Sequence, residues 1–249
     1  VAIISENTFA NCKALTQLSL PSAVIIEDAA FSGCESLKSI SDGDIQAEDF
    51  GDKSFYGCKS LAQKVNTSAS TIGTSAFEAS GITELYIDGT VGNTIVIGAK
   101  AFTKCPNLKI AEIDAATDIK YSVGAGVFED CTALTSAVYT GPVIADSMFS
   151  GCTALEKVTT FGTAIEDDAF KGCTALKSVQ DMSGASMVAA SIGDSAFAGC
   201  ESLVDVHANR TTVFTGSSQY AGCSTIKTAP VNTLTKGMFS ECTSLESVG

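Results

Sequence analysis

Apolar residues recur along this chain in one fixed phrase: an aromatic residue, two further residues, Cys, two more residues, and then Leu or Ile. The ten complete copies are Phe9–Cys12–Leu15, Phe31–Cys34–Leu37, Phe55–Cys58–Leu61, Phe102–Cys105–Leu108, Phe128–Cys131–Leu134, Phe149–Cys152–Leu155, Phe170–Cys173–Leu176, Phe197–Cys200–Leu203, Tyr220–Cys223–Ile226 and Phe239–Cys242–Leu245. An eleventh copy, Phe77–Ser80–Ile82, carries Ser for Cys and is one residue short. Self-similarity at such a period predicts a stacked solenoid.

Two further apolar marks accompany each copy. The first lies five residues before the aromatic, as at Ile26, Ile72 and Ile165, and the copy around Tyr220 lacks it because Thr215 follows Phe214. The second lies nine residues after the aromatic, as at Val179. In the third copy Lys64 occupies that place, and we expect a slip of one residue that lets Val65 serve instead. One repeat cannot bury these side chains alone, whereas stacked repeats bury them in aligned columns.

The segment after each Leu alternates apolar and polar residues, which is typical of a short strand. Stacking predicts one parallel sheet from these strands, with neighbours about 4.8 Å apart. The segment before each Cys has apolar residues five and three apart, and the spacing favours one helical or 3-10 turn closed by Gly. The predicted fold is an α/β solenoid of about eleven repeats, with the sheet on a concave face and turns or irregular coil on the other.

The pattern Ile-x-x-x-Ala-Phe-x-Gly-Cys-x-x-Leu-x-x-Val, seen almost letter for letter at 165–179 and 192–206, resembles the BspA-like (treponemal-type) leucine-rich repeat. The resemblance extends over essentially the whole chain. It implies a right-handed leucine-rich-repeat stack in a cell-surface or secreted protein of a bacterium or protozoan, used for adhesion to host proteins or neighbouring cells. The repeats predict a single solenoid domain over residues 1–249, and because the repeat shows no polar caps we expect a fragment of a longer protein.

Composition narrows the class of partner. A net charge of −13 without any Lys/Arg cluster disfavours nucleic acid and anionic membrane as ligands. No apolar run reaches the length of a membrane span, so no membrane insertion is expected in this chain. The lengthened repeats, at 65–74, 181–191 and 211–218, are rich in small polar residues and predict loops on one face. We expect a monomer, although terminal edge strands could associate end to end.

The ten cysteines, which all belong to the phrase, form one predicted column. Disulfides between adjacent repeats are conceivable at a Cα separation near 5 Å, but parallel Cβ vectors oppose the required torsion of about 90°. Buried free thiols that pack as small hydrophobic groups are therefore expected, and Ser80 suggests a size requirement in the column. A zinc site is disfavoured because Cys residues more than about 20 residues apart lack the short ligand spacing. No cofactor is predicted.

Other candidate chemistry is sparse. A dyad of Cys200 and His207 is conceivable, but the single His of the chain is expected at the surface beside Asp205. The acidic clusters Asp42-Gly43-Asp44 and Glu166-Asp167-Asp168 lack the ligand pattern of a calcium loop, and the second is expected at the start of a helical turn. Asn66-Thr67-Ser68 and Asn209-Arg210-Thr211 are glycosylation sequons that matter only in a host that modifies Asn. We therefore predict no catalytic or metal site and no enzyme.

The predicted concave face is the expected binding surface, because solenoids bind along their sheets. Outward strand residues are small and polar except in the middle repeats. There Tyr86, Ile110, Glu112 and Val138 form the predicted contact for a host matrix or cell-surface protein. The alternative is solvated strand surface without a partner. At the level of the chain, the first hypothesis is a protein-binding adhesion module, the second is a structural spacer that displays another domain, and carbohydrate binding is disfavoured by the lack of stacked aromatics.

Overall fold

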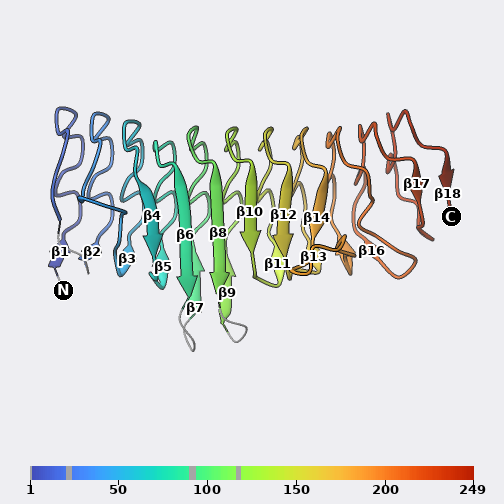
Figure 1. Ribbon diagram of the computed structural model, residues 1–249, viewed down its shortest axis with the longest axis horizontal. Helices are drawn as coiled ribbons and strands as arrows, with labels where there is room; N and C mark the ends of the chain where they lie inside the picture. Colours follow the sequence, from blue (N-terminus) through green and yellow to red (C-terminus); the bar gives the residue numbers. More distant parts are fainter. Residues whose placement is uncertain (1, 21–23, 90–93, 116–118) are drawn as a thin grey trace. The chain divides into compact units, whose positions relative to one another are not determined.

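The computed structural model describes residues 2–20, 24–89, 94–115 and 119–249. The chain divides into two compact units, Val1–Thr132 and Ala133–Gly249. Each unit is a parallel β-solenoid in which a repeat contributes one or two short strands and a turn (Figure 1). The expectation that residues 1–249 form one domain stays a prediction.

Unit 1 contains two parallel sheets. The strands that precede the aromatic residue form the aromatic-side sheet, in the order β1 (Ala2–Ile4), β2 (Val24–Ile26), β3 (Asp49–Phe50), β5 (Thr71–Ile72), β7 (Thr94–Ile97) and β9 (Lys120–Val123). The strands that follow the Leu form the Leu-side sheet, in the order β4 (Lys64–Thr67), β6 (Glu84–Gly89) and β8 (Ile110–Ala115). Every pairing within these two sets is parallel.

Unit 2 repeats the arrangement with shorter strands. Its Leu-side strands are β10 (Ser136–Tyr139), β12 (Lys157–Thr160) and β14 (Ser178–Gln180), and a separate pair is formed by β17 (Thr228–Ala229) and β18 (Ser247–Val248). Its aromatic-side strands are β11 (Val143–Ile144), β13 (Ala164–Ile165), β15 (Ser191–Ile192) and β16 (Val213–Phe214). The sequence predicts the Leu-side strands, although the described segments after Leu15, Leu37 and Leu203 form no strand. It misses the aromatic-side sheet, whose strands have only two to four residues.

The core consists of aligned columns of identical side chains. Aromatic rings of successive repeats stack with centroids 5.0–5.6 Å apart in unit 1 and 5.2–5.5 Å apart in unit 2. Such offset aromatic pairs contribute stability beyond the area that they bury. The predicted slip in the third copy is confirmed, since Val65 is fully buried and pairs with Leu85. Phe214 replaces Thr215 in the same way, because it pairs with Ile192.

The prediction of helical or 3-10 turns is wrong. Among the described residues no helix occurs, and the segment before each Cys is a run of turns. In the repeat of Phe170, amides alternate between two targets: Lys171 N and Cys173 N bond three residues back, whereas Phe170 N donates to Ala196 O of the next repeat at 2.7 Å. An α-helix would direct all these amides along its own axis, so the bonds to the neighbouring repeat exclude it. Positive φ angles of 53° at Asp168 and 72° at Gly172 break the helical backbone as well.

Candidate functional site

The outward side chains of β4, β6 and β8 in unit 1 form the surface that we call the acidic face. It comprises Lys64, Asn66, Glu84, Tyr86, Asp88, Ile110, Glu112 and Asp114. Strand alternation explains the segregation, because Leu85 and Ile87 of β6 are buried while Tyr86 between them is partly exposed. The parallel register places Tyr86 beside Glu112, and Glu84 beside Ile110.

A small polar network orients Tyr86. Lys64 Nζ lies 2.7 Å from Glu84 Oε2, and the Tyr86 hydroxyl donates to the same carboxylate at 2.8 Å. The hydrogen bond from Lys64 lowers the pKa of Glu84, and the same bond raises the pKa of Lys64. The hydrogen bond to Glu84 raises the pKa of Tyr86. The phenol is therefore a neutral donor at neutral pH, held by its hydrogen bond to Glu84.

Carboxylates outnumber cations on this surface. Lys64 forms an ion pair with Glu84. The other acids of the face are Glu112, Asp88 and Asp114, and Asp88 and Asp114 occupy matching positions on the adjacent strands β6 and β8. Side chains on adjacent parallel strands are separated by about 4.8 Å, so the two Asp side chains start from neighbouring backbone positions and repel each other when ionised. An open surface cavity of about 460 Å³ borders the face and is lined by Gln46, Ala47, Glu48, Asn66, Thr67, Ser68 and Asp88.

Three of the four residues predicted for protein contact thus share one surface of unit 1. Val138 lies in β10 of unit 2, half-buried and paired with Thr159. Sequence reasoning missed Lys64, Asp88 and Asp114 as members of the face. The signal was the period-two alternation, which runs on beyond the expected strand ends in Glu84-Leu-Tyr-Ile-Asp88 and Ile110-Ala-Glu-Ile-Asp114.

The ten cysteines are free thiols in the structure, and eight of them are buried. Cys12 is exposed and Cys242 is half-buried, in contrast to the expected burial of the whole column. Most of these thiols donate to the carbonyl oxygen of the aromatic residue one repeat earlier, at 2.9–3.1 Å, as Cys200 does to Phe170 O. Ser80 lies in the same column, and its Oγ is 3.5 Å from Cys105 Sγ.

Burial decides the chemistry of these thiols. Desolvation raises the pKa of Cys58 and of Cys223 to about 12, and burial likewise raises the pKa values of Cys173 and Cys200. The thiolate is the reactive form, so these side chains are unreactive at neutral pH. Their hydrogen bonds satisfy carbonyl groups of the neighbouring repeat, which is a structural role.

The expectation for His207 is wrong, because its side chain is buried with 1% exposure. Residues 181–190, which lengthen the preceding repeat, fold back against β14 and cover the ring. Val179 N donates to Nε2 at 3.1 Å, and Nδ1 lies 3.1 Å from Met187 O. Cys200 donates instead to Phe170 O, so the conceivable dyad has both members engaged elsewhere. Burial lowers the pKa of His207, which keeps the ring neutral.

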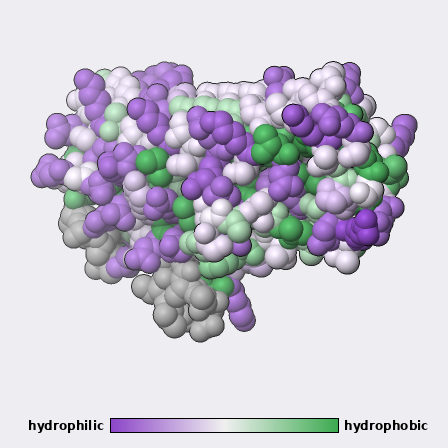
Figure 2. Space-filling view, turned by 45° about the vertical axis from the view of Figure 1, so that its right-hand side comes forward, coloured by the Kyte–Doolittle hydropathy of each residue, from purple (hydrophilic) through white to green (hydrophobic). Residues whose placement is uncertain are grey.

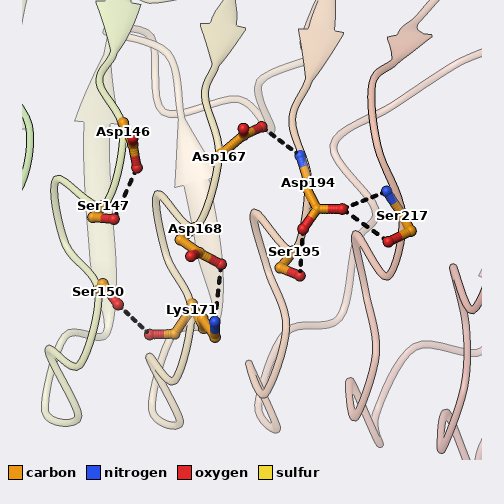
Figure 3. A network of polar contacts seen from close by, with 9 residues as sticks. All are labelled: Asp146, Ser147, Ser150, Asp167, Asp168, Lys171, Asp194, Ser195 and Ser217. Atoms are coloured by element: carbon orange, nitrogen blue, oxygen red, sulfur yellow. Dashed lines mark hydrogen bonds and ion pairs between the residues drawn. The ribbon is translucent and has the colours of Figure 1, made fainter.

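The prediction that acidic residues before the turns lie at the start of a helix is wrong, because they accept hydrogen bonds from the next repeat. Asp167 Oδ1 accepts the backbone N–H of Asp194 at 2.7 Å, and Asp194 Oδ1 accepts the N–H and hydroxyl of Ser217 at 2.6 and 2.8 Å (Figure 3). Asp52 of unit 1 accepts Thr74 N in the same way. Each of these carboxylates therefore accepts a hydrogen bond from a backbone N–H of the next repeat. The backbone hydrogen bond from Ser217 lowers the pKa of Asp194.

The remaining candidate motifs are built into local turns. Asn209 Oδ1 accepts the N–H and hydroxyl of Thr211, and Ser41 Oγ donates to Gly43 O within the Asp42–Asp44 segment. In the part of the chain that the structure describes, no three His, Cys, Asp or Glu side chains are grouped for a metal ion. The described residues likewise include no helix with the length and apolar character needed to cross a membrane. Apolar surface appears as separate patches among polar side chains in Figure 2.

Stacked aromatic and thiol columns, a parallel sheet with one displayed face and a repeat of 19–27 residues define a solenoid of the leucine-rich-repeat class. The model of the BspA type leucine-rich repeat region matches residues 2–135, 49–177 and 163–249. The chain therefore belongs to the BspA type leucine-rich repeat family. No curated protein matches it.

Several solved bacterial proteins are similar at low identity. A leucine-rich repeat protein from Bacteroides ovatus is 22% identical with a TM-score of 0.35, and the match covers 100% of this chain and 78% of that one. The T. pallidum leucine-rich repeat protein is 24% identical with a TM-score of 0.41 over 83% of this chain and 73% of that one. A leucine-rich cell surface protein from Faecalibacterium prausnitzii is 17% identical with a TM-score of 0.40, covering 100% and 82%.

Proposed function

We propose that this chain is a non-catalytic protein-binding module of a secreted or cell-surface protein, and that the acidic face of unit 1 is its contact surface. Leucine-rich repeats generally serve protein interaction, and their sheets supply extended binding surfaces. One observation carries the assignment to this face. The in-register pairing of β6 and β8 holds Tyr86 beside Glu112, with Ile110 on the same strand as Glu112.

The chemistry of the face favours a basic partner. Glu112, Asp88 and Asp114 add three carboxylates to the face, whereas the cation of Lys64 is already paired with Glu84. Electrostatic complementarity favours a partner surface rich in Lys and Arg, and the Tyr86 ring offers a platform for stacking a guanidinium group. Tyr is among the residue types that most often anchor interfaces. The proposed ligand is a basic segment of a host matrix or neighbouring-cell protein.

The buried thiols are compatible with an extracellular setting. Free cysteines in an oxidising compartment persist when the thiol is buried and protonated. Desolvation of Cys58 and Cys223, which raises both pKa values to about 12, provides that protection in each unit. Proposed localisation at the cell surface therefore agrees with the chemistry of the core.

The proposal is tested with a panel of extracellular-matrix and serum proteins of high and low isoelectric point, assayed against the immobilised chain. We expect saturable binding of basic members, weakening as salt rises from about 50 to about 300 mM, because exposed charges are screened. The double variant Tyr86→Ala, Glu112→Ala should lower affinity at least about tenfold, the loss of a central interface anchor. The matched control is Ser178→Ala, Gln180→Ala on the Leu-side strand of unit 2. Full binding by the first variant would contradict the proposal, and no binding by the wild-type chain would favour a spacer role.

A further inference from the structure

The buried imidazole of His207 closes a lengthened repeat. Residues 181–190, called the strap below, leave β14 and fold back on it. Met187 N donates to Val179 O at 3.0 Å, and Gln180 and Ser186 form an antiparallel bridge. Ala189 N donates to the backbone oxygen of His207 at 2.7 Å. The strap therefore lies between β14 and the segment that carries His207.

The ring fills the gap between two backbone groups. Val179 N donates to Nε2, so this nitrogen must be unprotonated, and Nδ1 carries the proton toward Met187 O. The imidazole thus joins the N–H of the strand to the C=O of the strap. Ser186 Oγ lies 3.2 Å from Nδ1 and donates to Asp205 Oδ2 at 2.5 Å. Only the neutral ring satisfies Val179, because a second ring proton would place two donors face to face.

We propose that His207 is an acid-sensitive latch, and that protonation of its ring favours release of the strap from β14 increasingly as the pH falls below about 6.5, the titration midpoint of a free imidazole. The closed state requires the neutral ring, whereas the released ring is free to be charged. Acidification therefore favours release, and a return to neutral pH restores the closed strap. The lowered pKa of His207 agrees with this direction.

Other ionisable groups lie on the segments around His207. Asp205 on the same segment favours the charged ring, but burial has the larger effect on the pKa of His207. Tyr220 of the next repeat donates to Val206 O, and burial raises its pKa well above the usual value for a phenol. Asp181 of the strap is bound by the N–H groups of Ser183 and Ala185. Bonding to Ser183 lowers the Asp181 pKa, so this carboxylate stays ionised through the acid range that releases the latch.

Release would change a surface that is already partly apolar. Met182 and Val188 of the strap are 44% and 49% exposed, whereas Met187 beneath them is only 6% exposed. Opening the strap uncovers Met187 and the imidazole and frees both backbone groups of Val179. The latch is thus a local, reversible change in one repeat, and it leaves the acidic face of unit 1 out of the mechanism.

Hydrogen exchange of the whole chain between about pH 7.5 and about pH 4.5, corrected for intrinsic rates, tests the latch. We expect protection of the Met187 and Ala189 amides to fall by up to about tenfold per pH unit below about pH 6.5, which is the limit for one linked proton. Strand β12 is the internal control and should keep its protection. Unchanged strap protection, or an equal loss in β12, would overturn the proposal.

A variant and a spectroscopic titration separate the latch from general acid effects. His207→Gln cannot be protonated, so its strap protection should be independent of pH in this range, and a persistent pH response would assign the effect to another group. Because the chain has one His, selective isotope labelling gives a single imidazole signal in the wild-type protein. Its midpoint should lie below about 6.5, the value of a free imidazole, and coincide with the exchange midpoint. Titration at or above that value without loss of protection would refute the latch even if the variant failed to fold.

Discussion

The Leu-side strands of the two units share the same buried columns but display different outer surfaces. In unit 1, β6 and β8 each have six residues and present charged side chains with Tyr86 and Ile110. In unit 2, β10, β12 and β14 have three or four residues and present mainly Ser, Thr, Lys and Gln. The inward positions are alike, since Leu85, Ala111, Val158 and Val179 are all buried.

Stacking therefore constrains the inward side chains of each strand and leaves the outward side chains free to vary. An inward side chain must match the repeats on both sides, so its size and type recur. An outward side chain contacts mostly solvent and neighbouring outward residues. Stacking does not require the large and charged side chains that gather on the outward side of β6 and β8. The acidic face is therefore the best candidate for a binding surface.

Disruption of the stacked aromatic columns, which both units contain, should destabilise the protein most. Phe102→Ala in unit 1 and Phe170→Ala in unit 2 each remove a fully buried ring from the stack. Each should lower the apparent free energy of unfolding by about 3–5 kcal/mol, because a cavity remains in a packed column. Urea denaturation measures it. A loss below about 1 kcal/mol in one unit only would show that the columns differ.

Thiol reactivity tests the burial of the cysteine column. A rise of the pKa from 9.0 to about 12 at Cys58 in unit 1 and Cys223 in unit 2 lowers the thiolate fraction at about pH 8 roughly a thousandfold. We expect mass spectrometry after brief alkylation of the native chain to find Cys12 labelled and both of these unlabelled. Denaturant should make all ten cysteines equivalent. Rapid labelling of Cys58 would contradict the buried-column account.

The carboxylates before the turns have a smaller effect. Because bonding to Ser217 lowers the folded-state pKa of Asp194, its stabilising contribution is present above the unfolded value near 3.9 and is lost as the pH falls through the lower folded value. Asp194→Asn should cost about 1 kcal/mol at neutral pH and weaken the acid dependence. Asp146→Asn is the control, since Asp146 Oδ1 accepts only the Ser147 hydroxyl among these contacts (Figure 3). Equal losses of stability in the two variants would show that the hydrogen bonds that Asp194 accepts from the next repeat do not stabilise the fold.

The sequence predicted those features that the repeat imposes on buried positions. The aromatic and cysteine columns, the Leu-side strands and the substitution of Val65 for Lys64 all follow from the spacing of apolar residues. The aromatic-side sheet could not be predicted because most of its strands are too short to show alternation. The turns were misjudged because their amides bond to the next repeat, a partner that spacing within one repeat does not reveal.

The candidate site could be predicted only in part. Alternation in 84–86 and 110–112 identified Tyr86, Ile110 and Glu112, whereas the roles of Lys64 and Asp88 depend on register between repeats. His207 was expected at the surface because it follows Val206 at a strand end, beside Asp205. The contact with the strap that buries it could not be predicted, because the strap is an insertion without apolar period. The burial of His207 arises from a backbone contact between Val179 and Met187, in a strap that mixes Ala, Met and Val with small polar residues.

Folding and binding measured on the same samples test whether the acidic face serves binding and not stability. Wild-type chain and the Tyr86→Ala, Glu112→Ala variant are compared by urea denaturation and by titration with a basic partner from the panel. We expect at least about a tenfold loss of affinity with a change below about 1 kcal/mol in the free energy of unfolding, because both side chains point outward and, among the contacts that the structure describes, only the hydrogen bond from Tyr86 to Glu84 is lost. Unchanged affinity, or a loss of affinity that follows only from unfolding, would contradict this expectation.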